Sequence, residues 1–172
     1  MIWIIPISVI VAVLSYILTG VTLKFLRRRA ILDHPNERSS HTVPIPRGGG
    51  IPIVGITISL WIIPIDGNEF GSIEILLVGA IMLAAISWLD DLKPRSPALR
   101  LAVQVIAVGL GIYSFPADAT LFGNILPQWI EVCTIGLAWL WFINLFNFMD
   151  GIDAISSAQT IGICLGLIVL GL

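Results

Sequence analysis

The chain has 172 residues, of which 57% are hydrophobic and only 12% are charged, and its formal net charge is −2. Its mean hydropathy of +0.99 is far above that of a water-soluble domain of this length. This composition excludes an ordinary soluble domain and predicts a protein of the lipid bilayer, for which we expect no nucleic-acid partner.

Six apolar runs follow one another along the chain. Each has roughly 17 to 23 residues, about the length that crosses the hydrocarbon core of a bilayer as a helix. We therefore predict an all-α, multi-pass membrane protein with about six transmembrane helices in a single membrane domain, residues 1–172. The predicted spans are Ile2–Phe25, Gly48–Ile65, Ile73–Leu89, Leu99–Phe115, Ile130–Phe148 and Ile155–Leu172.

Basic residues mark one side of this predicted domain. The connections 66–72 and 116–129 contain no Lys or Arg, whereas all nine lie in or directly beside the first and third connections. Because basic residues beside spans are retained in the cytoplasm, we predict that the first, third and fifth connections are cytoplasmic and both termini external. The nine are Lys24, Arg27, Arg28, Arg29, Arg38, Arg47, Lys93, Arg95 and Arg100.

The spans themselves contain almost no ionisable residue, and their notable polar groups are Gln104, Asn144 and Gln159. Transporters and proton pumps usually carry acids or bases near the bilayer midplane. A transport function is therefore less favoured than chemistry at the membrane surface.

The first connection ends in Arg47 followed by Gly48, Gly49 and Gly50, directly before an apolar run. Glycines let backbone N–H groups approach a ligand, and a helix N-terminus is a favourable place for phosphate. The Gly-Lys-Ser/Thr ending of an ATP-binding loop is missing, so that interpretation fails. The alternative is a flexible loop whose arginines only set the membrane topology.

Asp90 and Asp91 end the third span, because the Lys93-Pro94 pair does not easily continue a helix. Carboxylates at a helix C-terminus face the negative end of the helix dipole, which is unfavourable unless a cation is held there. A divalent metal with oxygen ligands, Mg²⁺ or Mn²⁺, resolves this conflict. The alternative is neutralisation by nearby basic residues: Lys93, Arg95 or Arg100.

The end of the fifth span places Asn144, Asn147, Asp150 and Asp153 three residues apart. On a continuous helix the first three share a sector about 120° wide, and Gly151 is expected to end the helix and turn Asp153 elsewhere. Amides in an apolar setting need partners. Hydrogen bonds between helices are one explanation, whereas ligand or metal binding explains the added acids better.

Taken together, these segments resemble the polyprenyl-phosphate N-acetylhexosamine-1-phosphate transferases of glycosyl transferase family 4. The variants of the first motif look more like enzymes that initiate surface-polysaccharide synthesis than like the muramyl-pentapeptide transferase. The matching motifs are Asp33-x-Pro35-x-x-Arg38-Ser39-x-His41-x-x-Pro44-x-Pro46-Arg47-Gly-Gly-Gly50, Asp90-Asp91 followed by Arg100 and Gln104, and Asn144-x-x-Asn147-Phe148-Met149-Asp150-Gly151-Ile152-Asp153.

The resemblance implies transfer of an N-acetylhexosamine 1-phosphate from a UDP-sugar to undecaprenyl phosphate, with release of UMP, in the bacterial cytoplasmic (inner) membrane. It places this step at the start of lipopolysaccharide O-antigen or other cell-envelope polysaccharide synthesis. It further implies catalytic roles for Asp90, Asp91 and Asp150, with Mg²⁺ or Mn²⁺ on Asp91 and Asp150. Substrate binding would fall to Arg38, His41, Arg47, Gly48, Gly49, Gly50, Asn144, Asn147 and Asp153.

Two features depart from the family pattern. Members are about twice as long, with a further Asp and a His-rich motif in later loops, and many have glycine where this chain has Ala154. We therefore expect the chain to correspond to the N-terminal half of such a transferase, to need a complementing C-terminal half or a second copy, and to show little activity alone. The alternative is an inactive membrane fragment or one half of a split enzyme.

Overall fold

The computed structural model describes residues 4–33, 35, 42–62, 70–116, 120, 122–123, 125–149 and 155–171. Within these residues the chain forms helices and one small hairpin, which confirms the predicted all-α class. The helices are α1 (Ile4–Arg28), α2 (Ile51–Ile62), α3 (Phe70–Leu92), α4 (Pro97–Tyr113), α5 (Gln128–Met149) and α6 (Ile155–Leu170), and the strands are β1 (Leu32–Asp33) and β2 (Ile45–Pro46).

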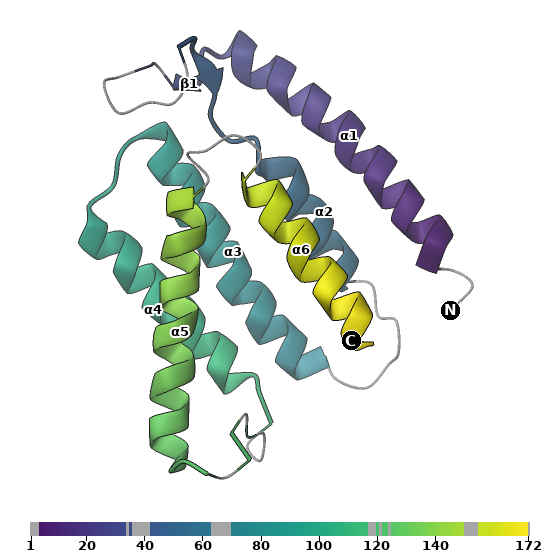
Figure 1. Ribbon diagram of the computed structural model, residues 1–172. Helices are drawn as coiled ribbons and strands as arrows, with labels where there is room; N and C mark the ends of the chain where they lie inside the picture. The colour runs from purple at the N-terminus through teal and green to yellow at the C-terminus, as the bar shows by residue number, and fades with distance from the viewer. Residues whose placement is uncertain are drawn as a thin grey trace.

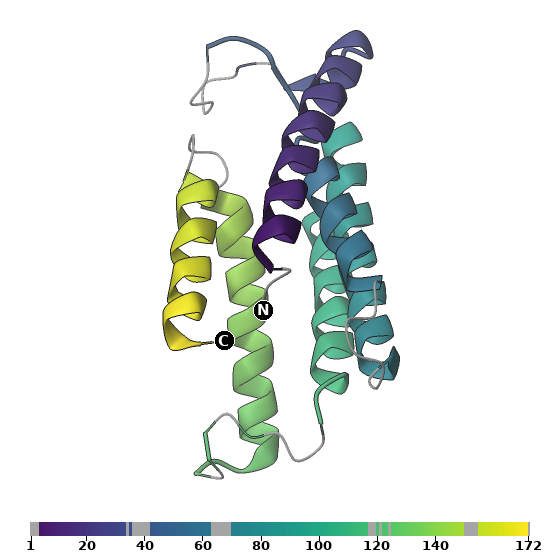
Figure 2. The ribbon, with the colours of Figure 1, turned by 90° about the vertical axis from the view of Figure 1, so that its right-hand side faces the viewer.

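The helices run up and down, and each packs against the next one along the chain. Figures 1 and 2 show that α1, α3 and α5 end, and α2, α4 and α6 begin, at the end of the bundle that carries the hairpin. Both chain termini lie away from this end (Figure 1). The most extensive helix contact joins α3 and α4. All three motif segments therefore belong to one end of the bundle.

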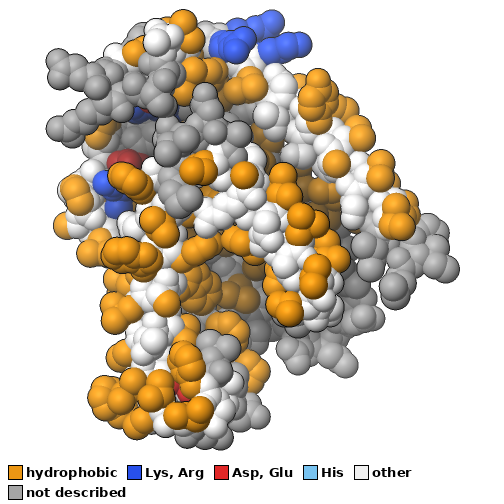
Figure 3. Space-filling view, viewed as in Figure 1, with side chains coloured by type: hydrophobic (Ala, Val, Ile, Leu, Met, Phe, Trp, Pro, Cys, Tyr) orange, Lys and Arg blue, Asp and Glu red, His pale blue; other side chains and the backbone are white. Residues whose placement is uncertain are grey.

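Most large apolar side chains on the described helices face outward. Among the described residues, the apolar side chains of Leu26, Pro52, Ala107 and Val108 are buried. Figure 3 shows basic side chains gathered near the hairpin end and an apolar surface over most of the rest of that face. Such a surface is suited to lipid rather than to water. By length and apolar composition, α1, α3 and α5 can each cross a membrane, and α2, α4 and α6 are shorter apolar helices.

Small residues bring α4 close to both of its neighbours. A Cβ added to Gly79 of α3 would lie 3.2 Å from the Ala107 carbonyl oxygen of α4, and one added to Gly111 of α4 would collide with the Trp139 ring of α5. Small residues at helix contacts allow this close approach in membrane bundles. Helix α4 is thus held between α3 and α5, whose C-terminal ends carry two of the three motifs.

The helix bounds differ from the predicted spans by up to three residues, and two of these differences have a clear local cause. Helix α2 begins at Ile51 rather than Gly48, because Gly48 to Gly50 form a turn ahead of it. Helix α4 begins at Pro97, where Ser96 accepts a hydrogen bond from the Leu99 N–H as the N-cap. Proline in the first helical turn loses no intrahelical bond, so it starts this helix rather than breaking it.

Candidate active site

The connection between α1 and α2 forms a short antiparallel hairpin in its described part. Leu32 pairs with Pro46 and Asp33 with Ile45, and the Arg47 N–H donates to the Ile31 carbonyl at 3.1 Å. This pairing brings the Asp33 carboxylate to the Arg47 guanidinium, with which it forms an ion pair through Nη2. The base of the connection is therefore ordered, in contrast to the flexible loop that we considered as an alternative.

Gly48 forms the contact between this hairpin and α3. Its φ is +93°, a conformation that favours glycine, and a Cβ at this position would collide with the Trp88 ring of α3. Gly49 and Gly50 have open space where a Cβ would be, and α2 begins immediately after them. The glycine run thus leads into a helix N-terminus as predicted, and its role in holding phosphate remains a prediction.

Arg47 joins the first motif to the second. Besides its ion pair with Asp33, its Nη1 donates to the backbone carbonyl of Asp91, at 3.4 Å, at the end of α3. Together with the contact of Gly48 on Trp88, this places the Arg47-Gly48 segment directly against the Asp90-Asp91 end of α3. Two motifs that are more than forty residues apart in the sequence therefore form one surface.

The two neighbouring aspartates have different surroundings. The Asp90 carboxylate accepts from the Arg95 N–H at 2.6 Å and from Arg100 Nη1 at 3.0 Å. The alternative of neutralisation by arginine therefore describes Asp90. Because the Asp90 and Arg100 side chains remain 27% and 38% exposed, their attraction is worth at most about 1 kcal/mol, and its main effect is geometric. The half-buried Asp91 remains our candidate metal ligand.

The third motif meets α4 through a pair of amides. Asn144 Nδ2 donates to Gln104 Oε1 at 2.9 Å, and Gln104 Nε2 donates back to Asn144 Oδ1 at 3.4 Å. Asn144 Nδ2 also donates to the Leu140 carbonyl at 2.8 Å. Hydrogen bonding between helices therefore accounts for Asn144. Asn147, nearly one turn further along α5, is exposed and available for a ligand.

Four predicted site residues lie outside the described residues, namely Arg38, His41, Asp150 and Asp153. Within the described residues, no three His, Cys, Asp or Glu side chains gather in a group that could hold a metal ion. The predicted magnesium site depends on Asp91 together with Asp150, so it remains a prediction.

Two contacts in the site did not follow from our reading of the motifs. These are the ion pair of Asp33 with Arg47 and the choice of Gln104 as the partner of Asn144. Some signal was present, since Asp33 and Gln104 both stand in the motifs. Their partners depend on how the helices pack, which spacing along the chain does not show.

The fold and site define a polytopic membrane protein with charged and amide groups gathered at one end of its helices. Residues 73–172 match the family model described as glycosyl transferase family 4, and the chain belongs to this family.

Curated relatives agree with this assignment. The undecaprenyl-phosphate alpha-N-acetylglucosaminyl 1-phosphate transferase of Thermotoga maritima is 30% identical over 147 residues, which cover 85% of this chain and 45% of the relative. The decaprenyl-phosphate N-acetylglucosaminephosphotransferases of Mycobacterium tuberculosis and Mycobacterium leprae are 26% and 24% identical, each over 85% of this chain and 40% of the relative. The chain thus spans less than half the length of these relatives. No solved structure matches the chain.

The contact of Gly48 with Trp88 generates the first prediction. Gly48→Ala should loosen the hairpin from α3, because it combines a positive φ, a strain of about 1–3 kcal/mol, with a collision against the Trp88 ring. Trypsin should then cleave the Arg47–Gly48 bond of the detergent-solubilised chain faster, as measured by mass spectrometry of the released peptides. Gly50→Ala is the matched control, because open space surrounds that position. Equal cleavage rates in the two variants would contradict the proposed contact.

Proposed function

We propose that this chain supplies part of a membrane transferase site that moves an N-acetylhexosamine 1-phosphate from a UDP-sugar to undecaprenyl phosphate. The observation that carries the proposal is the convergence of the Arg47-Gly48 segment with the Asp90-Asp91 end of α3. This surface lies at the end of an apolar helix bundle of glycosyl transferase family 4. The curated relatives are named for a polyprenyl-phosphate acceptor and a transferred N-acetylglucosamine 1-phosphate, which supports the proposal.

In the proposed reaction, a phosphate oxygen of undecaprenyl phosphate attacks the sugar-linked β-phosphorus of the UDP-sugar. The bond between the β-phosphorus and the oxygen bridging to the α-phosphate breaks, and UMP leaves with that oxygen. Several anionic oxygens must approach one another during this step. Electrostatic stabilisation and positioning by fixed groups should therefore provide most of the catalysis.

We propose a separate binding role for each group of site residues, according to its chemistry. Arg47 and the N–H groups of Gly48, Gly49 and Gly50 are proposed to bind phosphate, with Arg38 and His41 from the same connection. Asn147 and Asp150 are proposed to contact the nucleotide diphosphate, and Asp153 the nucleoside. The carboxylates of Asp91 and Asp150 are hard oxygen donors suited to Mg²⁺ or Mn²⁺, which when bound would offset charge on the diphosphate.

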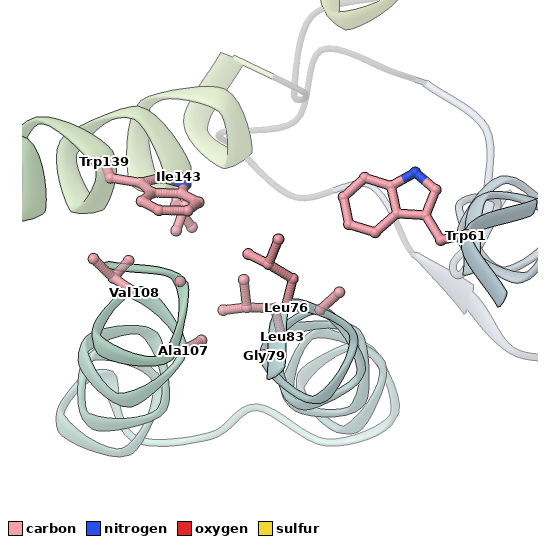
Figure 4. Close-up of a pocket in the computed structure, with 10 residues that line it drawn as sticks. Trp61, Leu76, Gly79, Leu83, Ala107, Val108, Trp139 and Ile143 are labelled. Atoms are coloured by element: carbon pink, nitrogen blue, oxygen red, sulfur yellow. The ribbon is translucent and has the colours of Figure 1, made fainter. Parts of the chain in front are cut away.

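An apolar cavity beside the site is suited to the lipid tail. It has a volume of about 120 Å³ and lies between α2, α3, α4 and α5. Figure 4 shows Trp139 and Ile143 facing Val108 across it, with Leu76 and Leu83 along one side and Trp61 further out. Leu83 precedes Asp90 by seven residues, about two helical turns, so a tail here would start near the proposed phosphate site. We propose that part of the isoprenoid chain occupies this cavity.

The unmatched part of the relatives bears on how the site is completed. Because the chain covers 45% of the T. maritima enzyme, we propose that a segment resembling the remaining part supplies further site residues. A complementing C-terminal half would provide that segment, whether it continues this chain or is a separate polypeptide. A role in starting O-antigen or another envelope polysaccharide is our proposal on the basis of the first motif.

The second prediction tests this function directly. With a complementing family half, undecaprenyl phosphate, UDP-N-acetylglucosamine and Mg²⁺, the chain should release UMP, and alone it should release little. Asp91→Asn and Asp150→Asn should each lower turnover at least ~10²-fold, as loss of a contact made in the transition state does. Thr134→Val is a control, because the Thr134 hydroxyl donates only to the Ile130 carbonyl within α5. Near-normal turnover in both aspartate variants would show that these acids are structural.

The third prediction concerns membrane topology. We propose that the motif end faces the cytoplasm of a bacterial inner membrane with both termini external, because basic residues gather at this end and UDP-sugars are cytoplasmic. In a background without Cys133 and Cys164, a cysteine at Ile125 should react with an impermeant thiol reagent in intact cells. A cysteine at Ala98, at the start of α4, should be protected. The reverse labelling pattern would contradict the proposed orientation.

A further inference from the structure

Two residues of α4 connect the C-terminal ends of α3 and α5. Arg100 and Gln104 are four residues apart, so they lie on the same face of α4. Arg100 Nη1 donates to Asp90 of α3 at 3.0 Å, and Gln104 exchanges hydrogen bonds with Asn144 of α5. One short stretch of α4 thus contacts both acidic motifs.

These contacts occupy most of the hydrogen-bonding groups of the Asp90 and Asn144 side chains. Both Asp90 oxygens accept bonds, one from Arg100 and one from the Arg95 N–H. The Asn144 amide bonds to Gln104 through both its oxygen and its nitrogen, and its nitrogen also donates to the Leu140 carbonyl. Asp90 and Asn144 are therefore oriented toward α4 and its preceding loop, while Asp91 and Asn147 follow them closely in the sequence.

Further along the bundle, α4 has little freedom to move. Gly79 of α3 packs on the Ala107 backbone, and the Trp139 ring of α5 covers Gly111. Close backbone packing fixes the helix axes, and the polar contacts of Arg100 and Gln104 then fix the ends of α3 and α5. Helix α4 therefore acts as a spacer between the two motif ends.

We propose that Arg100 and Gln104 are positioning residues that set the separation between Asp91 and Asn147, with Asp90 and Asn144 as their partners. Only the expected effect on turnover rests on the proposed transferase function. The distance between the ends of α3 and α5 can be measured without catalysis.

The first arm of the test measures that spacing. Spin labels at Leu92 and Phe148, both exposed at the ends of α3 and α5, are attached in a background lacking Cys133 and Cys164, with the chain in lipid nanodiscs. Pulsed electron resonance should give a narrow distance distribution for the parent chain. Arg100→Met and Gln104→Leu should broaden or shift it, and Thr134→Val should not. The exchange Gln104→Asn with Asn144→Gln keeps both amides and should restore the parent distribution.

The second arm measures turnover of the complemented chain. Gln104→Leu should lower kcat at least ~10-fold while KM for the UDP-sugar changes little, since positioning acts in the transition state. The exchange variant should recover most of the loss. No UMP release from the complemented parent chain would refute the proposed function. The distance measurement would then decide the positioning role by itself. Unchanged distances in both single variants, whatever their turnover, would overturn the positioning role.

Discussion

The C-terminal end of α3 carries Asp90 and Asp91 at the negative end of a helix dipole, and the rest of the site depends on how this charge is balanced. Arginines reach it from two directions. Arg47 donates to the Asp91 carbonyl while it pairs with Asp33, and Arg100 pairs with Asp90. Because these cations come from the segments on either side of α3, neutralising the helix end also docks the hairpin and α4 against it. One electrostatic requirement thus assembles two motifs.

The bilayer setting explains why the third motif is held by an amide pair. An amide left without partners in an apolar setting costs about 1–3 kcal/mol, and Asn144, which is exposed on α5, finds its partners in Gln104 and the Leu140 carbonyl. Reciprocal bonding satisfies both side chains whether or not a ligand is present. Helix α4 therefore holds the end of α5 without any ligand, and Asn147 is exposed. Such preorganisation is what the transfer that we propose would require.

Much of the fold was accessible from the sequence. Apolar runs predicted the helical class and one helix in each of the six spans, because hydrophobic length is a local property. The hairpin at Leu32 and Ile45 was not predicted, since two-residue strands leave no periodic pattern. In the site, the helix-dipole argument predicted a cation near Asp90 but did not distinguish a metal ion from an arginine. The packing of the helices places Arg100 beside the Asp90 carboxylate, and the spacing of the motifs does not show this packing. The glycine run leads into a helix N-terminus as predicted, whereas its turn ahead of α2 and its contact with Trp88 were not predicted.

The central claim, that arginine at the end of α3 assembles the site, is tested most directly by amide hydrogen exchange of the chain in lipid nanodiscs. Arg47→Met keeps the length of the side chain and removes its donors and charge. Exchange should then become faster, by up to about 5-fold, both in the hairpin and in the last turn of α3, because an ion pair as exposed as that of Arg47 with Asp33 contributes at most about 1 kcal/mol. Unchanged protection in both segments would contradict the account.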